Sequence, residues 1–376
     1  MQAMKSHTVP THSISRRHLL RAIGAGAILT TGCPMSMPET LPGQQDASTA
    51  TDSDSPSVEQ VIERVEKTLV REKQSRGLST MVNGAWQIFH GILAFANEFT
   101  IDTPEGRQNA VEYFAAGGVC DGFRPRIGNR FGDGTYGYLV DLQASTKVGQ
   151  GHRDQWLAVL AQAGQRLDAE WKIEDTSMRI ENWMRQAEFD VPINYEAEFS
   201  WTLIPLSFYR PTDYRWTARD GDTYSTELLV ESEVLRDLSA SVCGGTHRLI
   251  GIAYALRNRR AEGNSLNGVW AQAEDHLASA LEMARQNQNP DGTYSTAYLH
   301  RPGWCSDLGE SLGTTGHVLE VIAVAGDDSV LKEPWVRRSV NKLCDMLELC
   351  REVDLECGVL YHALHGLVEY QRRLTA

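Results

Sequence analysis

From residue 57 onward, hydrophobic and polar positions follow a pattern that predicts helices of two kinds. The first kind is long and charged with a single apolar stripe, which is typical of helices with one face in solvent. These segments span 57–75, 106–116, 167–188, 225–240, 267–287 and 333–350. The second kind is shorter, poor in charge and apolar on most sides, so we expect it to be buried on most sides. These segments begin at residues 84, 151, 199, 244, 316 and 358.

The regular alternation of outer and inner segments predicts an all-α fold, an (α/α)6 toroid of six helical hairpins around a central cavity. An open solenoid would have a more constant repeat length and polar capping helices at its ends. Here the first and last inner segments are as apolar as the middle ones, which favours closure. Because no Pro/Ser-rich linker divides residues 58–376, we expect them to form one toroid domain.

A second repeat consists of three similar turns, in which Gly supplies a positive φ and Asp caps the local backbone. Their sequences are GDGTYG at 132–137, DGDTYS at 220–225 and PDGTYS at 290–295. Together with Gln288, the last copy resembles the Q-x-x-D-G-x-W motif of the terpene-cyclase and protein-prenyltransferase superfamily, with Tyr in place of Trp. Members of that superfamily are α/α toroids, so the resemblance implies a fold more than an activity.

The catalytic motifs and zinc ligands of the superfamily have only partial counterparts in this sequence. Squalene-type cyclases protonate their substrate with a D-x-D-D motif, and residues 58–376 contain none. Protein prenyltransferases bind zinc through Asp, Cys and His, and lanthionine cyclases, which are also toroids, bind it through two Cys and one His. The segment 304–317 holds Cys305, Asp307 and His317, so the resemblance leaves a zinc site open without matching the families' spacing.

The N-terminus predicts an export signal over residues 1–33. Arg16 and Arg17 precede an apolar run that is too short to span a bilayer, and the pattern resembles twin-arginine translocation signals. Residues 29–33 resemble a bacterial lipobox, with Thr30 where leucine is favoured. We expect lipid attachment and cleavage at Cys33, ahead of simple cleavage.

Residues 34–57 are rich in Pro, Ser, Thr, Asp and Gly, which predicts a disordered tether. Signal and tether together predict an exported lipoprotein on the periplasmic or cell-envelope face of a bacterial membrane, held to that membrane through Cys33.

The net charge bears on the possible partners, and the cysteine content bears on possible disulfides. The formal net charge is −13 and no Lys/Arg block follows the signal, which argues against nucleic acid as a partner. Six cysteines follow Cys33, and an exported chain permits disulfides. Cys350 and Cys357 flank a predicted helix end and form the best candidate pair.

Polar side chains gather where the inner segments begin. In a toroid these N-terminal ends surround one mouth of the cavity, and their free N–H groups and positive dipole ends point into it. The candidate catalytic residues there are His152, His247, Arg248, His317 and His362. Each also has a structural alternative, as a capping histidine or as an arginine paired with an outer carboxylate.

Three hypotheses follow for this cavity, and all stay open at this point. In the first, His247 and His317 are general acid/base groups of a prenyltransferase-like or terpene-cyclase-like enzyme, or of a polysaccharide hydrolase or lyase. Further groups available for polysaccharide chemistry are Arg248, Tyr294, Asp307 and Glu310. In the second, Cys243, Cys305 and His317 bind zinc with an open fourth position. In the third, a non-catalytic lipoprotein binds a glycan, lipid or peptide in the cavity, or serves as an envelope scaffold.

Overall fold

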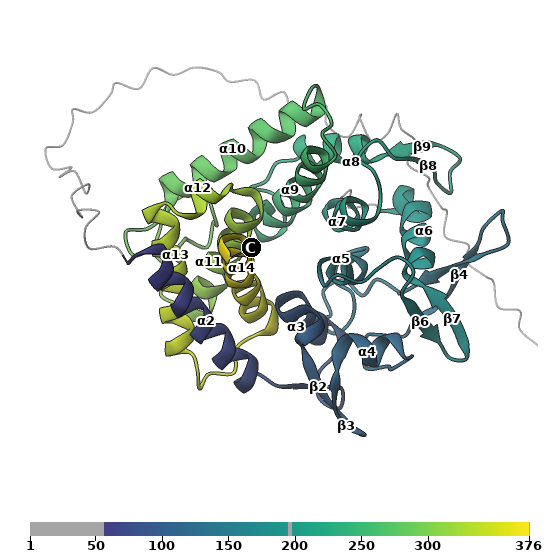
Figure 1. Cartoon of the computed structure of the whole chain (residues 1–376), viewed down its shortest axis with the longest axis horizontal. Helices are drawn as coiled ribbons and strands as arrows, with labels where there is room; N and C mark the ends of the chain where they lie inside the picture. The colour runs from purple at the N-terminus through teal and green to yellow at the C-terminus, as the bar shows by residue number, and fades with distance from the viewer. Residues whose placement is uncertain (1–55, 195–197, 376) are drawn as a thin grey trace, which may run out of the picture.

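The computed structural model describes residues 56–194 and 198–375. The predicted signal, Cys33 and all but the last two residues of the predicted tether lie outside this part of the chain. The structure is 55% helical and 12% strand, and its described residues contain nine strands in four small sheets. The predicted all-α (α/α)6 toroid is therefore wrong, because helices and strands are mixed along the chain (Figure 1).

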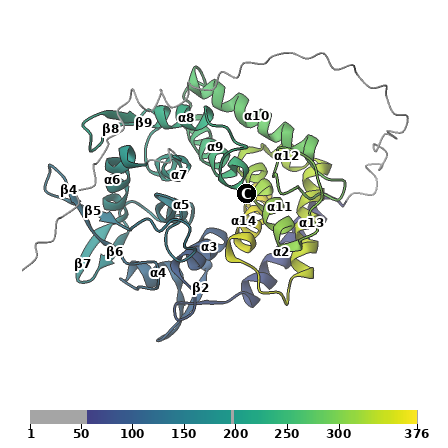
Figure 2. The ribbon, with the colours of Figure 1, turned by 180° about the vertical axis from the view of Figure 1, so that it is seen from behind.

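Apolar helices occupy the middle of the molecule, in Figure 1 and from behind in Figure 2. They are α3 (Ala85–Phe95), α5 (Gln155–Gln162), α7 (Ser200–Tyr209), α9 (Thr246–Ala261), α11 (Leu308–Ala325) and α14 (Cys357–Thr375). Each contacts the next in this order, and α14 also contacts α3. Helices α11 and α14 pack closely because Gly316 has no side chain. A Cβ at Gly316 on α11 would lie 2.7 Å from Cα of Ala363 on α14.

Charged helices cover the apolar ones. They are α2 (Val58–Ser75), α4 (Ala110–Ala115), α6 (Ile180–Asp190), α8 (Thr226–Val234), α10 (Val269–Asn287) and α13 (Pro334–Leu349), with the short α12 (Asp328–Leu331) before α13. α2 shows the expected amphipathic pattern: Ser57 and Gln60 form a capping box, and Val61, Val65 and Leu69 are buried. The described residues also contain three 3₁₀ turns, η2 (Ala96–Glu98), η3 (Val191–Ile193) and η4 (Val242–Gly245).

The strands form short hairpins at the periphery (Figure 1). β2 (Thr100–Thr103) pairs with β3 (Gly106–Asn109) and with the two-residue β1 (Leu78–Ser79). The other pairs are β4 (Arg126–Arg130) with β5 (Tyr136–Leu139), β6 (Glu170–Ile173) with β7 (Thr176–Arg179), and β8 (Arg215–Thr217) with β9 (Thr223–Ser225). In three cases the second strand runs directly into an outer helix, β3 into α4, β7 into α6 and β9 into α8.

Two of the repeated Asp-Gly turns explain why an all-helical prediction fails. Gly134 and Gly221 have φ of +86° and +85° and lie between β4 and β5 and between β8 and β9, respectively. Asp-Gly between short extended segments is a hairpin signal. The third turn, with Gly292 at φ +94°, closes on itself through the Asn289 N–H donating to Thr293 O at 2.9 Å and joins no strand pair.

The described cysteines are all free, so the predicted Cys350–Cys357 disulfide is not formed. No helix in residues 56–194 and 198–375 combines the length and the apolar character needed to cross a bilayer.

Candidate functional site

A pocket of about 450 Å³ lies where the N-terminal ends of the apolar helices meet. The candidate residues His152, Cys243, His247, His317 and His362 all line it. Apolar and aromatic walls come from Trp86, Val242, Tyr298 and Val359, and the charged residues at its rim are Lys147 and Glu356. Four of the five candidate catalytic residues, His152, His247, His317 and His362, thus line one pocket, whereas Arg248 does not.

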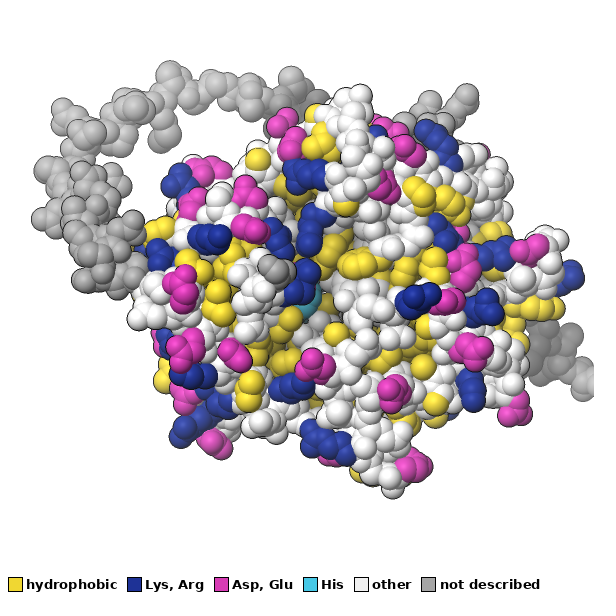
Figure 3. Space-filling view, viewed as in Figure 1, with side chains coloured by type: hydrophobic (Ala, Val, Ile, Leu, Met, Phe, Trp, Pro, Cys, Tyr) yellow, Lys and Arg dark blue, Asp and Glu magenta, His cyan; other side chains and the backbone are white. Residues whose placement is uncertain are grey.

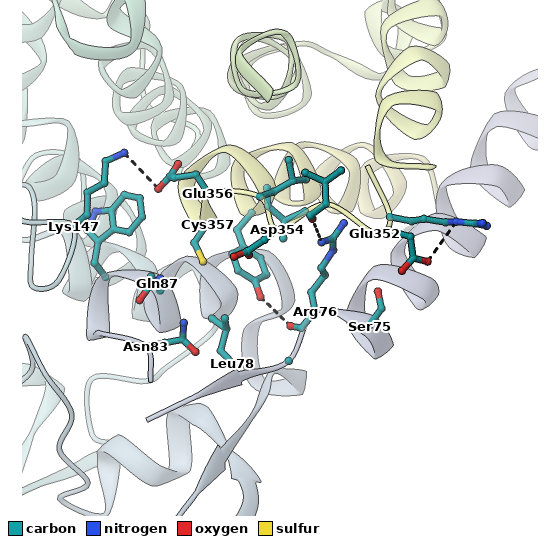
Figure 4. A pocket seen from close by; sticks show the side chains of 17 residues that line it. Ser75, Arg76, Leu78, Asn83, Gln87, Lys147, Glu352, Asp354, Glu356 and Cys357 are labelled. Carbon is teal, nitrogen blue, oxygen red and sulfur yellow. Dashed lines mark hydrogen bonds and ion pairs between the residues drawn. The ribbon is translucent and has the colours of Figure 1, made fainter. Parts of the chain in front are cut away.

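A larger pocket of about 690 Å³ adjoins this one and is drawn in Figure 4. Trp86, Lys147 and Glu356 line both pockets. The Lys147 ammonium lies 3.8 Å from the Glu356 carboxylate. The Lys147 side chain is largely exposed, so this ion pair is weak.

Cys243 is held in the pocket by an unusual turn. Cys243, Gly244 and Gly245 have φ of +51°, +63° and +78° in succession, directly before α9 begins at Thr246. A Cβ at Gly244 would lie 2.7 Å from Tyr298 Cβ, so only glycine fits there. Non-glycine residues in the left-handed region are costly and cluster at functional sites, which singles out Cys243.

The Cys243 thiol and the imidazoles of His247 and His317 form a potential metal-binding group. One ligand atom from each residue lies within 4.8 Å of the other two. Nδ1 of His317 donates to the Gly313 carbonyl at 2.8 Å, which leaves its Nε2 as the coordinating nitrogen. Thiolate and imidazole are the ligands that zinc prefers, and three protein ligands leave a fourth position open.

His247 is the least satisfied side chain of this group. Both of its ring nitrogens are buried without a hydrogen-bond partner among the described residues. Its Nδ1 lies 3.7 Å from Oε1 of Glu198, and Oε2 of Glu198 accepts a hydrogen bond from His152 Nδ1 at 2.8 Å. His152, Glu198 and His247 make a second group whose ligand atoms lie within 4.8 Å of one another. A buried imidazole without partners is costly unless something binds it.

His362 extends the histidine layer deeper into the molecule. Its ring centroid lies 4.1 Å from that of His317, and its Nδ1 lies 2.8 Å from Oε2 of Glu320. The other oxygen of Glu320 accepts from His365 Nδ1 at 2.6 Å. Burial and the neighbouring His317 lower the pKa of His362 to about 4, so His362 is neutral at physiological pH.

The charges of the metal-binding group are coupled. Burial opposes ionisation of the Cys243 thiol, but His247 and His317 outweigh it and hold its pKa well below the usual range of a thiol. Conversely, Cys243 and Glu198 hold the pKa of His247 above its usual value in spite of burial. The site is therefore built for a thiolate, the form that binds metals and attacks electrophiles.

Two predicted residues have other roles. The Arg248 guanidinium donates to Glu233 at 2.8 Å and to the Ser241 hydroxyl at 2.9 Å, and Arg248 is not among the residues that line the pocket. Cys305 lies outside both metal-binding groups, with its thiol 3.4 Å from the Asp307 carbonyl. The structure thus places His247 where the predicted zinc set had Cys305.

The groups considered for polysaccharide chemistry are also separated from the pocket. Tyr294 is fully buried, and Asp307 caps α11 by accepting the Glu310 N–H at 2.8 Å. Neither of them, nor Glu310, lines the pocket.

Glu198 is the residue of the candidate site that the sequence analysis did not identify. It is a nearly buried carboxylate two residues before an apolar helix, and an acid at the edge of such a run is a usable signal. Its histidine partners come from segments 46 and 49 residues away in sequence, so only the fold shows that they meet.

No protein-family model, no curated protein and no solved structure matches this chain.

Proposed function

We propose that the protein is a zinc-dependent enzyme whose metal is held by Cys243, His247 and His317 at the inner wall of the central pocket. The observation that carries this proposal is the convergence of one thiol and two imidazoles within 4.8 Å, one of them the otherwise unpartnered His247. Zinc with one open position lowers the pKa of a bound water and polarises substrate oxygens.

The residues around this group fit supporting roles. Glu198 lies behind His247, where it orients the ring and increases its basicity as a ligand. His152, on the other oxygen of Glu198, is positioned to take a proton from a pocket ligand. Trp86, Tyr298 and Val359 offer aromatic and apolar surface to the body of a mid-sized organic substrate.

The cell-envelope location remains part of this proposal. We infer from the twin-arginine and lipobox-like sequences that the enzyme is exported and anchored through Cys33. Twin-arginine export suits a protein that folds, and loads its metal, before translocation.

Metal analysis with matched cysteine variants tests the proposal. The protein is purified without chelator, and its metal content is measured by mass spectrometry together with its free thiols. We expect about one zinc ion per chain, retained in Cys305→Ala and lost in Cys243→Ala and His317→Ala. Zinc retained equally in Cys243→Ala and Cys305→Ala would contradict the proposed ligand set.

One observation favours a second candidate, a cysteine nucleophile. The left-handed backbone of Cys243 presents its thiol to His247, with Glu198 behind the imidazole, which is the order of nucleophile, base and orienting acid in thiol enzymes. A metal-free protein in which iodoacetamide alkylates Cys243 far faster than Cys305 would overturn the zinc proposal and support this one.

A further inference from the structure

A second cavity, of about 430 Å³, opens at the opposite ends of the apolar helices. Its apolar walls include Leu93, Phe208 and Val368, and its polar lining includes Gln162, Arg257 and Arg372. This is the face on which α14 ends. Figure 3 shows dark blue Lys and Arg side chains around a histidine near its middle.

The cavity is distinct from the central pocket. Between them lies a void of only about 10 Å³ that shares Leu93 and Gln162 with the second cavity and His247 and His362 with the central pocket. A void of that size holds at most about one water molecule. A ligand of one cavity therefore does not reach the other.

Arg257 is a charged group of this cavity with an unsatisfied hydrogen-bond donor. Its Nη1 is buried without a hydrogen-bond partner among the described residues, and its guanidinium lies 5.7 Å from the Tyr254 ring centroid. Burial lowers the pKa of Arg257; Arg373 and Arg372 act in the same direction, and Tyr254 and Glu369 act against it. An arginine stays charged in proteins, so this site holds a cation that needs an anion.

Glu369, a carboxylate that lines the same cavity, is already bound by Arg372. Glu369 accepts from Nε of Arg372 at 3.0 Å and from Nη2 of the same residue at 2.5 Å, so both of its oxygens are used. The ring of His365 approaches Glu369 from the interior, with Nε2 at 4.0 Å.

Cations near helix C-termini also stabilise the helix dipole, and α9 has Arg259 and Arg260 in its last turn for that role. Arg257 lies one turn earlier and points into the cavity. A second buried atom without a partner, Oε1 of Gln162, lines the same space. Two unsatisfied polar atoms that face one cavity favour a ligand site over a simple surface charge.

We propose that this second cavity binds an organic anion, a carboxylate on an apolar body, with the carboxylate on Arg257 and the body against Leu93, Phe208 and Val368. A charge-assisted pair with arginine supplies the affinity for the head group, and burial of apolar surface supplies that for the tail. This site does not depend on the zinc proposal.

Calorimetric titration of the full chain with octanoate tests the inference, with octylammonium as the probe of equal tail and opposite charge. We expect octanoate to bind and octylammonium not to bind. Arg257→Gln should weaken octanoate binding about tenfold or more. Arg260→Gln, an exposed arginine of the same helix that pairs with Glu274, should leave it unchanged.

Phe208→Asp provides a second variant in case Arg257→Gln does not fold. Phe208 is 46% exposed, so the fold should tolerate the change, and a carboxylate at the cavity rim should repel octanoate. No octanoate binding to the wild-type protein at millimolar concentration would overturn the inference. So would equal octanoate affinity in the wild-type protein and Phe208→Asp, or equal affinity for octylammonium.

Discussion

The Glu198 carboxylate joins two histidines, with Oε2 2.8 Å from His152 Nδ1 and Oε1 3.7 Å from His247 Nδ1. A carboxylate behind a metal-binding imidazole fixes the ring orientation and raises its basicity. The hydrogen bond from His152 and the nearby ring of His247 hold the pKa of Glu198 well below its usual value even though burial opposes this. These contacts favour the ionised form of Glu198 beside the proposed metal ligands.

Glu198→Gln should weaken zinc binding about 10- to 100-fold while leaving the fold intact. The amide keeps the size of the side chain but removes the charge that favours His247 as a ligand. Competition with a chromophoric chelator measures the change. Glu274→Gln, which removes an exposed carboxylate paired with Arg260, is the control and should leave zinc affinity unchanged. If both variants bound zinc with the same affinity, Glu198 would have no role in zinc binding.

The buried helices could be predicted because a helix surrounded by protein is apolar on most sides. For α3, α7, α9 and α14 the predicted starts lie within two residues of the observed ones. α11 begins at Leu308, well before the predicted Gly316. Its first turns carry Thr314 and Thr315, which read as loop residues. In the fold they bond to Tyr294, since Thr315 accepts the Tyr294 N–H at 3.1 Å.

The strands were missed for a different reason. They are two to five residues long and carry charged side chains on their exposed faces, as Lys172 does beside the buried Trp171. So short a run gives little period-two signal next to an amphipathic helix. The Asp-Gly turns and the β-branched or aromatic residues beside them were the available signal for hairpins.

The candidate site was predictable in position but not in chemistry. Histidines at the starts of inner helices could be read from the sequence, and His152, His247, His317 and His362 do line one pocket. Only the fold shows that His247, and not Cys305, belongs to the metal-binding group, because the ligand set depends on which turns face each other. The left-handed turn at Cys243 determines where the thiol lies, and Gly244 and Gly245 were the only indication of this turn in the sequence.

Gly244→Ala should destabilise the protein by about 2–4 kcal/mol, because the new methyl group adds a collision to an unfavourable backbone conformation. The ideal Cβ lies 2.7 Å from Tyr298 Cβ. Gly263→Ala is a matched control, with a similar φ of +71° and nothing within 4 Å of its Cβ, and should cost only about 1 kcal/mol. Urea denaturation measures both. If both substitutions lowered the free energy of unfolding equally, the turn at Cys243 would have shifted to accommodate the methyl group.

Asp154→Asn should stabilise the protein in a pH-dependent way. Asp154 is buried, has φ of +65° and accepts from Thr202 Oγ1 at 2.6 Å. Asparagine tolerates this backbone and keeps the acceptor. Burial raises the pKa of Asp154 to about 6 from a model-peptide value of 3.8. The folded state therefore binds the proton more tightly than the unfolded state, and stability is lost as pH rises between these two values.

Denaturation at about pH 4 and pH 8 should then show little effect of Asp154→Asn at the lower pH and a gain of about 1–3 kcal/mol at the higher one. The exposed Asp168, which pairs with Arg166 at 2.9 Å, provides the control. Asp168→Asn should leave the stability at pH 8 nearly unchanged and should not stabilise, because exposed ion pairs contribute little. A gain in Asp154→Asn that is the same at both pH values would trace the effect to packing and not to the buried charge.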